Sequence, residues 1–102
     1  MQIKHRLYQG TLYAVLSGEL DEHSAHYVRD KLDEIFLTMK CNQIIIDLSE
    51  MEFMDSTGIG VLIGRYKKLK NLGVPIYICN PSCHAEKIFK MTGLYEIMPK
   101  IG

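Results

Sequence analysis

The sequence has no excess of charge of either sign, no tryptophan and no long apolar run. Lys plus Arg equals Asp plus Glu at 12 each, so the formal net charge is zero. Nucleic acids and anionic membranes usually select proteins with a basic excess, so neither is an expected partner. No apolar stretch approaches the ~18 residues of a membrane span, and the N-terminus lacks the apolar segment of a signal peptide.

The chain contains only three cysteines. An odd and small number of cysteines makes a poor disulfide framework. A cytoplasmic, reducing compartment is therefore expected. Cys79, Cys83 and His84 lie close together in the sequence. No second pair of ligands follows them, so we expect no metal site, and nothing indicates a cofactor. The histidines lack a neighbouring motif that would mark a general base.

The chain does contain enough apolar residues for one packed domain spanning residues 1–102, since 47% of it is hydrophobic. Residues 2–8 and 11–17 are short strand-like runs around Gln9 and Gly10. Apolar and polar residues alternate in them, as in strands with one buried face. This pattern predicts an N-terminal β-hairpin.

Helical and strand-like segments alternate after the hairpin. Apolar residues recur at helical spacing in segments 18–40 and 53–70 and again after Pro81. The runs 42–51 and 74–80 are short, apolar and rich in isoleucine, which is typical of strands buried on both faces. The predicted fold class is an α/β sandwich with right-handed crossovers, whose elements follow the order β-β-α-β-α-β-α-β.

The ends of these elements carry their own signals. Ser24, or a residue just before it, is expected to cap the first helix. Pro81 fits the first turn of the third helix, and Gly93 fits its end. The final segment 94–102 is predicted to form one last short strand. The charged side chains of 65–73, RYKKLKNLG, are expected to be solvated.

The stretch FMDSTGIGVLIGRYKKLK at 53–70 places hydroxyl residues directly before an apolar helix. A dinucleotide-binding fingerprint would need its third glycine at Ile63, and a P-loop would need Lys-Ser or Lys-Thr after Gly64. The serine-nucleophile elbow would need glycine at Met54. None of these motifs is met, so we expect Gly58, Gly60 and Gly64 to serve close packing of this helix on the sheet.

Two roles remain for the hydroxyls of this stretch. Asp55, Ser56 or Thr57 can cap the helix by accepting hydrogen bonds from its free backbone N–H groups. Alternatively, Ser56 is a modification site, because a phosphate there would lie at the positive end of the helix. Such a phosphate would add about −1.5 to −2 charges beside Asp55 and Glu52. Periodicity and spacing do not decide between these roles.

GELDEHSA at 18–25 and the stretch at 53–70 resemble the two hallmark segments of STAS-domain anti-sigma factor antagonists. The similarity is greatest to the sporulation anti-sigma-F members. It continues through MTGLYEIM at 91–98. The resemblance implies the STAS fold, a mixed sheet with helices. We expect no catalytic activity, because none of the candidate nucleophiles has a partner that would activate it.

The resemblance also implies a partner-switching function. The unmodified antagonist binds a nucleotide-bound anti-sigma factor that is also a serine kinase, and the sigma factor is released. The kinase then phosphorylates the serine after the motif aspartate, which corresponds to Ser56, and a serine phosphatase resets the switch. Asp21, Asp55, Thr57 and Gly58 correspond to positions at or near the phosphorylation site, so they are expected to bind the partner together with Ser56.

The sequence departs from this family at two points. Thr57 stands where a second serine is common, so it is a second candidate acceptor. The chain also stops at Gly102, without the usual final amphipathic helix, so the sheet face beneath such a helix is expected to be exposed or shielded by another chain. Two other functions remain as alternatives: a STAS scaffold or sensor domain in a stress-type pathway, and a small hydrolase that uses Ser56.

Overall fold

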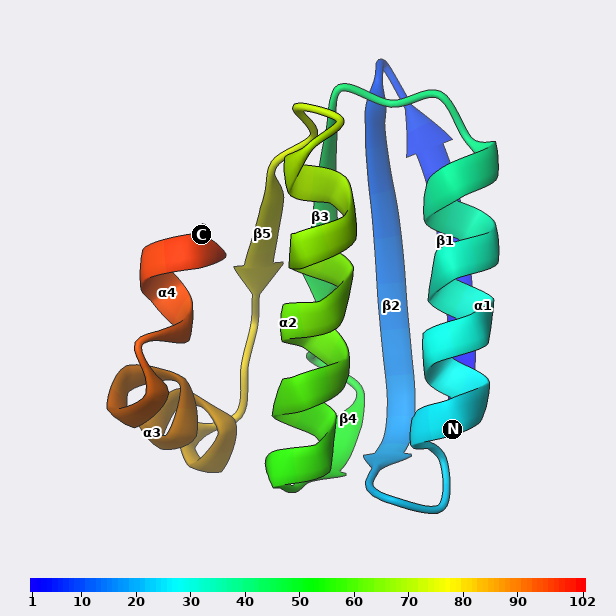
Figure 1. Ribbon diagram of the computed structural model, residues 1–102. Coiled ribbons are helices and arrows are strands. Elements are labelled where there is room, and N and C mark those ends of the chain that lie inside the picture. Colours follow the sequence, from blue (N-terminus) through cyan, green and yellow to red (C-terminus); the bar gives the residue numbers. More distant parts are fainter.

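A β-hairpin begins the fold in the computed structural model, which covers residues 1–102 (Figure 1). Strand β1 (Gln2–Tyr8) pairs antiparallel with β2 (Thr11–Leu20), as the alternation of residues predicted. Gln9 and Gly10 both have positive φ, at 49° and 81°. This backbone conformation is typical of two-residue hairpin turns, because its twist matches that of the flanking strands.

The remaining strands complete a mixed sheet in the order β1-β2-β3-β5. Strand β3 (Gln43–Asp47) is parallel to β2 and to β5 (Ile76–Cys79), and β4 (Met51–Met54) pairs with the far end of β2. The α/β class with a mixed sheet is confirmed. None of the helices has both the length and the apolar character needed to cross a membrane.

The long helices α1 (Ala25–Thr38) and α2 (Ser56–Lys70) lie side by side over one face of the sheet, while α3 (Cys83–Thr92) and α4 (Leu94–Ile97) lie beyond β5 (Figure 1). The core lies between these helices and the sheet. Every second residue of β2 faces it, so Leu12, Ala14 and Leu16 are fully buried. In β3 all three isoleucines are buried, as predicted for a strand enclosed on both faces.

The strand predicted at 42–51 is shorter than expected, since β3 ends at Asp47. The Asp47 carboxylate accepts a hydrogen bond from the Ser49 backbone N–H at 2.9 Å, which stabilises a turn. After this turn the chain forms β4, a strand that the sequence analysis did not predict. Only four residues long, β4 gives too short an alternation to be recognised among its polar neighbours.

The strand predicted at 94–102 is wrong for its first half, because residues 94–97 form the short helix α4. The second half is extended but makes only one β-bridge, between Lys100 and Ile78 of β5. The Lys100 ammonium also contacts Glu86 Oε1 at 2.7 Å, and the Tyr95 hydroxyl donates to the same oxygen at 3.2 Å. Burial raises the pKa of Tyr95 to about 12, and the Glu86 carboxylate adds to this shift. These contacts fasten the C-terminal segment to the domain.

The predicted helix caps are partly right. Ser24 occupies the N-cap position of α1, but its hydroxyl does not cap the helix and instead donates to the Glu19 carbonyl at 2.8 Å. Pro81 lies before α3, outside its first turn, and Ser82 caps that helix by accepting from the Ala85 N–H at 3.1 Å. Gly93 ends α3 with a φ of 74°, as the sequence predicted.

Candidate functional site

Parallel pairing of β2 with β4 brings the two segments that contain Asp21 and Asp55 together. Leu20 pairs with Met54 at the ends of these strands, so Asp21 and Asp55 leave the sheet at the same edge. The Asp55 backbone N–H donates to the Leu20 carbonyl at 3.3 Å, which ties the start of α2 to the end of β2. Segments 34 residues apart in the chain thereby meet at one end of the molecule.

Asp55 caps α2 by itself. One oxygen of its carboxylate accepts hydrogen bonds from the backbone N–H groups of Thr57 at 2.9 Å and Gly58 at 3.2 Å. Its carbonyl accepts from the Ile59 N–H at 3.3 Å. An aspartate in this position satisfies two of the free donors and places a negative charge at the positive end of the helix.

Ser56 is the first residue of α2 and is exposed, and its hydroxyl makes no hydrogen bond within the chain. Thr57 is also exposed, and only its backbone N–H takes part in the cap. Because Asp55 supplies the cap, helix capping does not explain why hydroxyl side chains follow it. The Ser56 hydroxyl is displayed to solvent at the tip of the helix.

The glycines of α2 differ in their surroundings. A Cβ atom on Gly58 would lie 2.6 Å from Met54 Cγ and 3.0 Å from the Leu20 carbonyl oxygen, so only glycine fits between α2 and the strand ends. Gly60 and Gly64 have no atom within 4 Å of such a Cβ. The prediction of close packing is therefore confirmed for Gly58 and wrong for Gly60 and Gly64, which lie on the outer side of the helix.

The loop after β2 is organised by Asp21. Its carboxylate accepts hydrogen bonds from the backbone N–H groups of Ser24 at 3.1 Å and His23 at 3.0 Å. The bond from Ser24 makes the largest contribution to lowering the pKa of Asp21 below its ordinary value. Asp21 is thus held as a carboxylate beside the start of α2, and no hydrogen bond joins it to Ser56.

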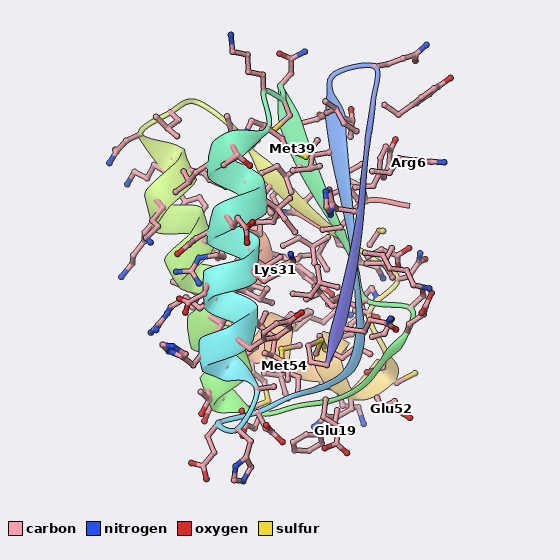
Figure 2. The ribbon with its side chains drawn as sticks, turned by 90° about the vertical axis from the view of Figure 1, so that its right-hand side faces the viewer. Arg6, Glu19, Lys31, Met39, Glu52 and Met54 are labelled. Carbon is pink, nitrogen blue, oxygen red and sulfur yellow. The ribbon has the colours of Figure 1, made fainter.

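Carboxylates gather at the end of the molecule where β2 and β4 end, beside the start of α2. No Lys or Arg occurs between residues 7 and 28 or between residues 41 and 64, the two segments that meet at this end. Figure 2 shows the labelled side chains of Glu19 and Glu52 near each other there, with Met39 at the opposite end. We call this region the acidic end, and its carboxylates are those of Glu19, Asp21, Glu22, Glu50, Glu52 and Asp55.

An open hollow of about 660 Å³ lies within the acidic end. Three carboxylates line it, those of Glu19, Asp21 and Glu52, together with His23 and the half-exposed ring of Tyr27. Such a surface suits the cationic side chains of a binding partner. The net charge of zero conceals this clustering, because it is a sum over the whole chain. The unequal spacing of the basic residues along the chain was the signal that would have revealed it.

Arg65 was expected to be solvated with the other charged residues of 65–73, and this expectation is wrong. Its side chain is buried between α1 and α2, with Nε 2.8 Å from Asp33 Oδ1. Burial lowers the pKa of Arg65, and the Asp33 carboxylate opposes this shift. Arg65 follows Val61 and precedes Leu69 at intervals of four residues, so its place in the apolar stripe was visible in the sequence.

The STAS domain family matches residues 2–102. Together with the mixed sheet and the helix that begins at Ser56, this match shows that the chain belongs to the STAS family. The resemblance noted in the sequence is therefore confirmed. The match covers almost the whole chain, including the hairpin and the C-terminal segment.

Relatives within this family carry more particular names. The chain is 37% identical over 99 residues to the anti-sigma F factor antagonist of Paenibacillus polymyxa, covering 97% of this chain and 85% of that one. It is 35% identical over 83 residues to the anti-sigma-B factor antagonist of Bacillus subtilis, covering 81% of this chain and 74% of that one.

A solved structure of the anti-sigma factor antagonist SpoIIAA in its unphosphorylated form superposes on this chain with a TM-score of 0.81. The two are 27% identical, and the alignment covers 99% of this chain and 89% of that one. SpoIIAA has also been solved in a phosphorylated form, which superposes with a TM-score of 0.75 and covers 92% of that chain.

Proposed function

We propose that this chain is an anti-sigma factor antagonist. Its unmodified form binds an anti-sigma factor that is also a serine kinase, and the sigma factor is released. Phosphorylation of Ser56 by that kinase weakens the complex, and a phosphatase restores it. The observation that carries the proposal is the Ser56 hydroxyl, which is exposed and unbonded at the tip of a helix that Asp55 already caps.

The folded domain can carry a phosphate at this position. Ser56 lies at the positive end of α2, where a negative group is stabilised by about 0.3–1 kcal/mol if it is exposed. No buried side chain has to move to admit it, because the hydroxyl points into solvent. The modified domain is therefore expected to keep its fold, so the change in binding arises at the contact with the partner.

Phosphorylation is expected to weaken binding through short-range effects at the contact with the partner. The acidic end favours a partner with a basic surface, and an added negative charge does not repel such a surface from a distance. A kinase pocket fitted to a small hydroxyl, however, has no room for a phosphate. That pocket also lies beside the phosphates of the bound nucleotide, so like charges meet there. Steric exclusion and local repulsion together favour release of the phosphorylated antagonist.

Asp21, Asp55, Thr57 and Gly58 complete the proposed binding surface in different ways. Asp21 and Asp55 follow the paired ends of β2 and β4, and their carboxylates also hold local backbone in place. Thr57 adds an exposed side chain next to Ser56. Gly58 is buried, so its part is to set the approach of α2 to β2 rather than to touch the partner.

We further propose that the chain has no catalytic activity of its own. A serine nucleophile needs a base within hydrogen-bond reach, and the Ser56 hydroxyl has no such partner. The nearest carboxylate along the chain, that of Asp55, is engaged with two backbone N–H groups. Turnover of an ester that disappears in Ser56→Ala would contradict this part of the proposal and favour the hydrolase alternative.

The decisive experiment uses the anti-sigma factor of the same organism. The purified chain is incubated with it and ATP, and the modified peptide is mapped by mass spectrometry. We expect one phosphate on Ser56, none in Ser56→Ala, and unchanged incorporation in the matched variant Thr57→Ala. Calorimetry with the nucleotide-bound kinase should show binding of the unmodified chain and of Ser56→Ala, and binding at least about tenfold weaker for the phosphorylated chain. Phosphate on Thr57 instead, or equal affinities, would overturn the assignment.

A role in stress signalling is the second candidate, because the matched relatives include antagonists named for sigma-B as well as for sigma-F. The two pathways predict different partners. Binding measured in parallel against each anti-sigma factor of the organism separates them. Assembly of the chain into a large multi-subunit particle would favour the scaffold alternative.

A further inference from the structure

A second hollow lies on the other side of Glu52 from the acidic hollow. It has a volume of about 280 Å³ and lies between β4 and the start of α3. Four of its seven lining residues are hydrophobic. We call it the β4–α3 hollow, and its lining residues are Met51, Glu52, Phe53, Met54, Ser82, His84 and Ala85.

The β4–α3 hollow has an exposed aromatic wall. Phe53 is 46% exposed, while Met54 next to it is buried in the core. Strand β4 pairs only with β2, so no other strand covers its outer edge. An exposed phenylalanine beside an apolar hollow is a site where a side chain of another protein can be buried. The domain's own helices leave this side of Phe53 open.

The hollow borders the acidic hollow and lies near Ser56 along the chain. Glu52 lines both the acidic hollow and the β4–α3 hollow, and Ser56 follows β4 by two residues. A kinase that holds the Ser56 hydroxyl in its active site therefore has to lie close to β4. The same partner surface would meet carboxylates on one side of Glu52 and apolar side chains on the other.

We propose that the β4–α3 hollow receives an apolar side chain of the anti-sigma factor, flanked by lysine or arginine residues that face Glu52. This inference rests on the proposed function and adds an anchor to it. The hollow is large enough for one aliphatic or aromatic side chain. Interfaces commonly depend on a few such buried anchors, with charged groups around them that contribute mainly to association rate.

The test compares two exposed apolar residues at opposite ends of the molecule. Phe53→Ser removes the wall of the hollow, and Leu72→Ser changes a residue that is 62% exposed in the turn after α2. Affinity is measured by calorimetry against the nucleotide-bound anti-sigma factor of the same organism. We expect Phe53→Ser to weaken binding at least tenfold and Leu72→Ser to change it less than twofold. Both variants are first checked for an unchanged melting temperature.

A second measurement covers the case in which Phe53→Ser does not fold. The methionine methyl groups of the wild-type chain are observed by NMR during titration with the anti-sigma factor. The methyl signal of Met51, which lines the hollow, should shift on binding. The signal of Met91 should not shift, because Met91 is 86% exposed near the C-terminal end of α3, away from the hollow. A Met51 signal that stays fixed in the complex would overturn the inference.

The remaining outcomes separate the two proposals. If the wild-type chain is neither bound nor phosphorylated by the anti-sigma factor, the proposed function and the inference fail together. If it binds and Phe53→Ser binds equally well, only the inference fails. If gel filtration instead shows a dimer that Phe53→Ser dissociates, the hollow serves self-association and the inference is wrong.

Discussion

The acidic end and the opposite end of the molecule differ in why their charges are there. At the opposite end, Lys67, Lys68 and Lys70 occupy the last turn of α2, where positive charge stabilises the negative end of a helix. At the acidic end, neither α1 nor α2 has an acidic residue in its first turn. Glu19, Glu50 and Glu52 lie in β2, in β4 or in the turn before it, outside the helices. Glu50 accepts a hydrogen bond from the Ser17 hydroxyl at 2.7 Å. Helix stability thus explains the lysines but does not explain Glu19 and Glu52, whose charges we take to serve the partner.

The largest expected effect is a difference in the free energy of unfolding between substitutions of Gly58 and Gly60, near the start of α2. Gly58→Ala should lower the free energy of unfolding by about 1–3 kcal/mol, because the methyl group meets Met54 and the Leu20 carbonyl. Gly60→Ala should raise it by up to about 1 kcal/mol, because alanine favours the helix and has open space around it. Denaturant unfolding measures both. Equal midpoints for the two variants would refute the packing difference.

A smaller difference in stability is expected between substitutions of Asp55, which caps α2, and of Ser56, whose hydroxyl is exposed. Asp55→Ala should destabilise the domain by about 1 kcal/mol, since the Thr57 and Gly58 N–H groups lose their acceptor. Ser56→Ala should change stability by less than about 0.5 kcal/mol, because its hydroxyl bonds to nothing. The two variants are compared by thermal unfolding in one buffer. A larger loss for Ser56→Ala would mean that the serine serves the fold after all.

Charge reversal at the two ends tests the comparison directly. Glu52→Lys should slow association with the anti-sigma factor by about threefold to tenfold at low salt, because it weakens electrostatic steering. Lys70→Glu should change the association rate by less than about twofold, because its charge supports the helix instead. Stopped-flow mixing at two salt concentrations measures both rates. If Lys70→Glu had the greater effect on association, the partner would dock at the opposite end.

The smallest expected effect concerns Asp21 and pH. Its pKa is lowered in the folded state, so its charged form contributes stability above the ordinary pKa of 3.8. That contribution is lost as the pH falls through the lowered folded-state pKa. The stability difference between wild type and Asp21→Asn should therefore shrink as unfolding is measured from about pH 6 down to about pH 3. A difference that is constant over this range would mean that the carboxylate charge is not involved.

The fold could be predicted from the sequence wherever a pattern was long enough. The hairpin, the three main helices and the two buried strands each repeat an apolar spacing several times. Strand β4 and helix α4 are four residues each, so their structure depends on contacts with β2 and with α3 more than on their own spacing. Short elements of this kind become visible only when the rest of the domain is in place.

The candidate site was predictable as a set of residues but not as a surface. The meeting of Asp21 and Asp55 depends on the register of β2 with β4, a strand that was not predicted. Gly58 and Gly60 are indistinguishable by type, and only the position of each around the helix separates the packed glycine from the free one. The β4–α3 hollow joins segments almost 30 residues apart, so no local pattern could reveal it.

The pairing of β2 with both β3 and β4 affects how the domain can unfold locally. Its first half, up to Val15, pairs with β3 and its last three residues pair with β4, with one register shift between Gly18 and Glu19 inside the pairing with β4. The turn that presents Ser56 is therefore hydrogen-bonded to the same strand that runs through the centre of the core. The Asp55 N–H bonds to the Leu20 carbonyl of β2, so this amide should exchange with solvent more slowly than that of Ser56, which has no acceptor within the chain. A modification of Ser56 therefore changes the surface that a partner can contact, while the strands that hold the turn keep their conformation.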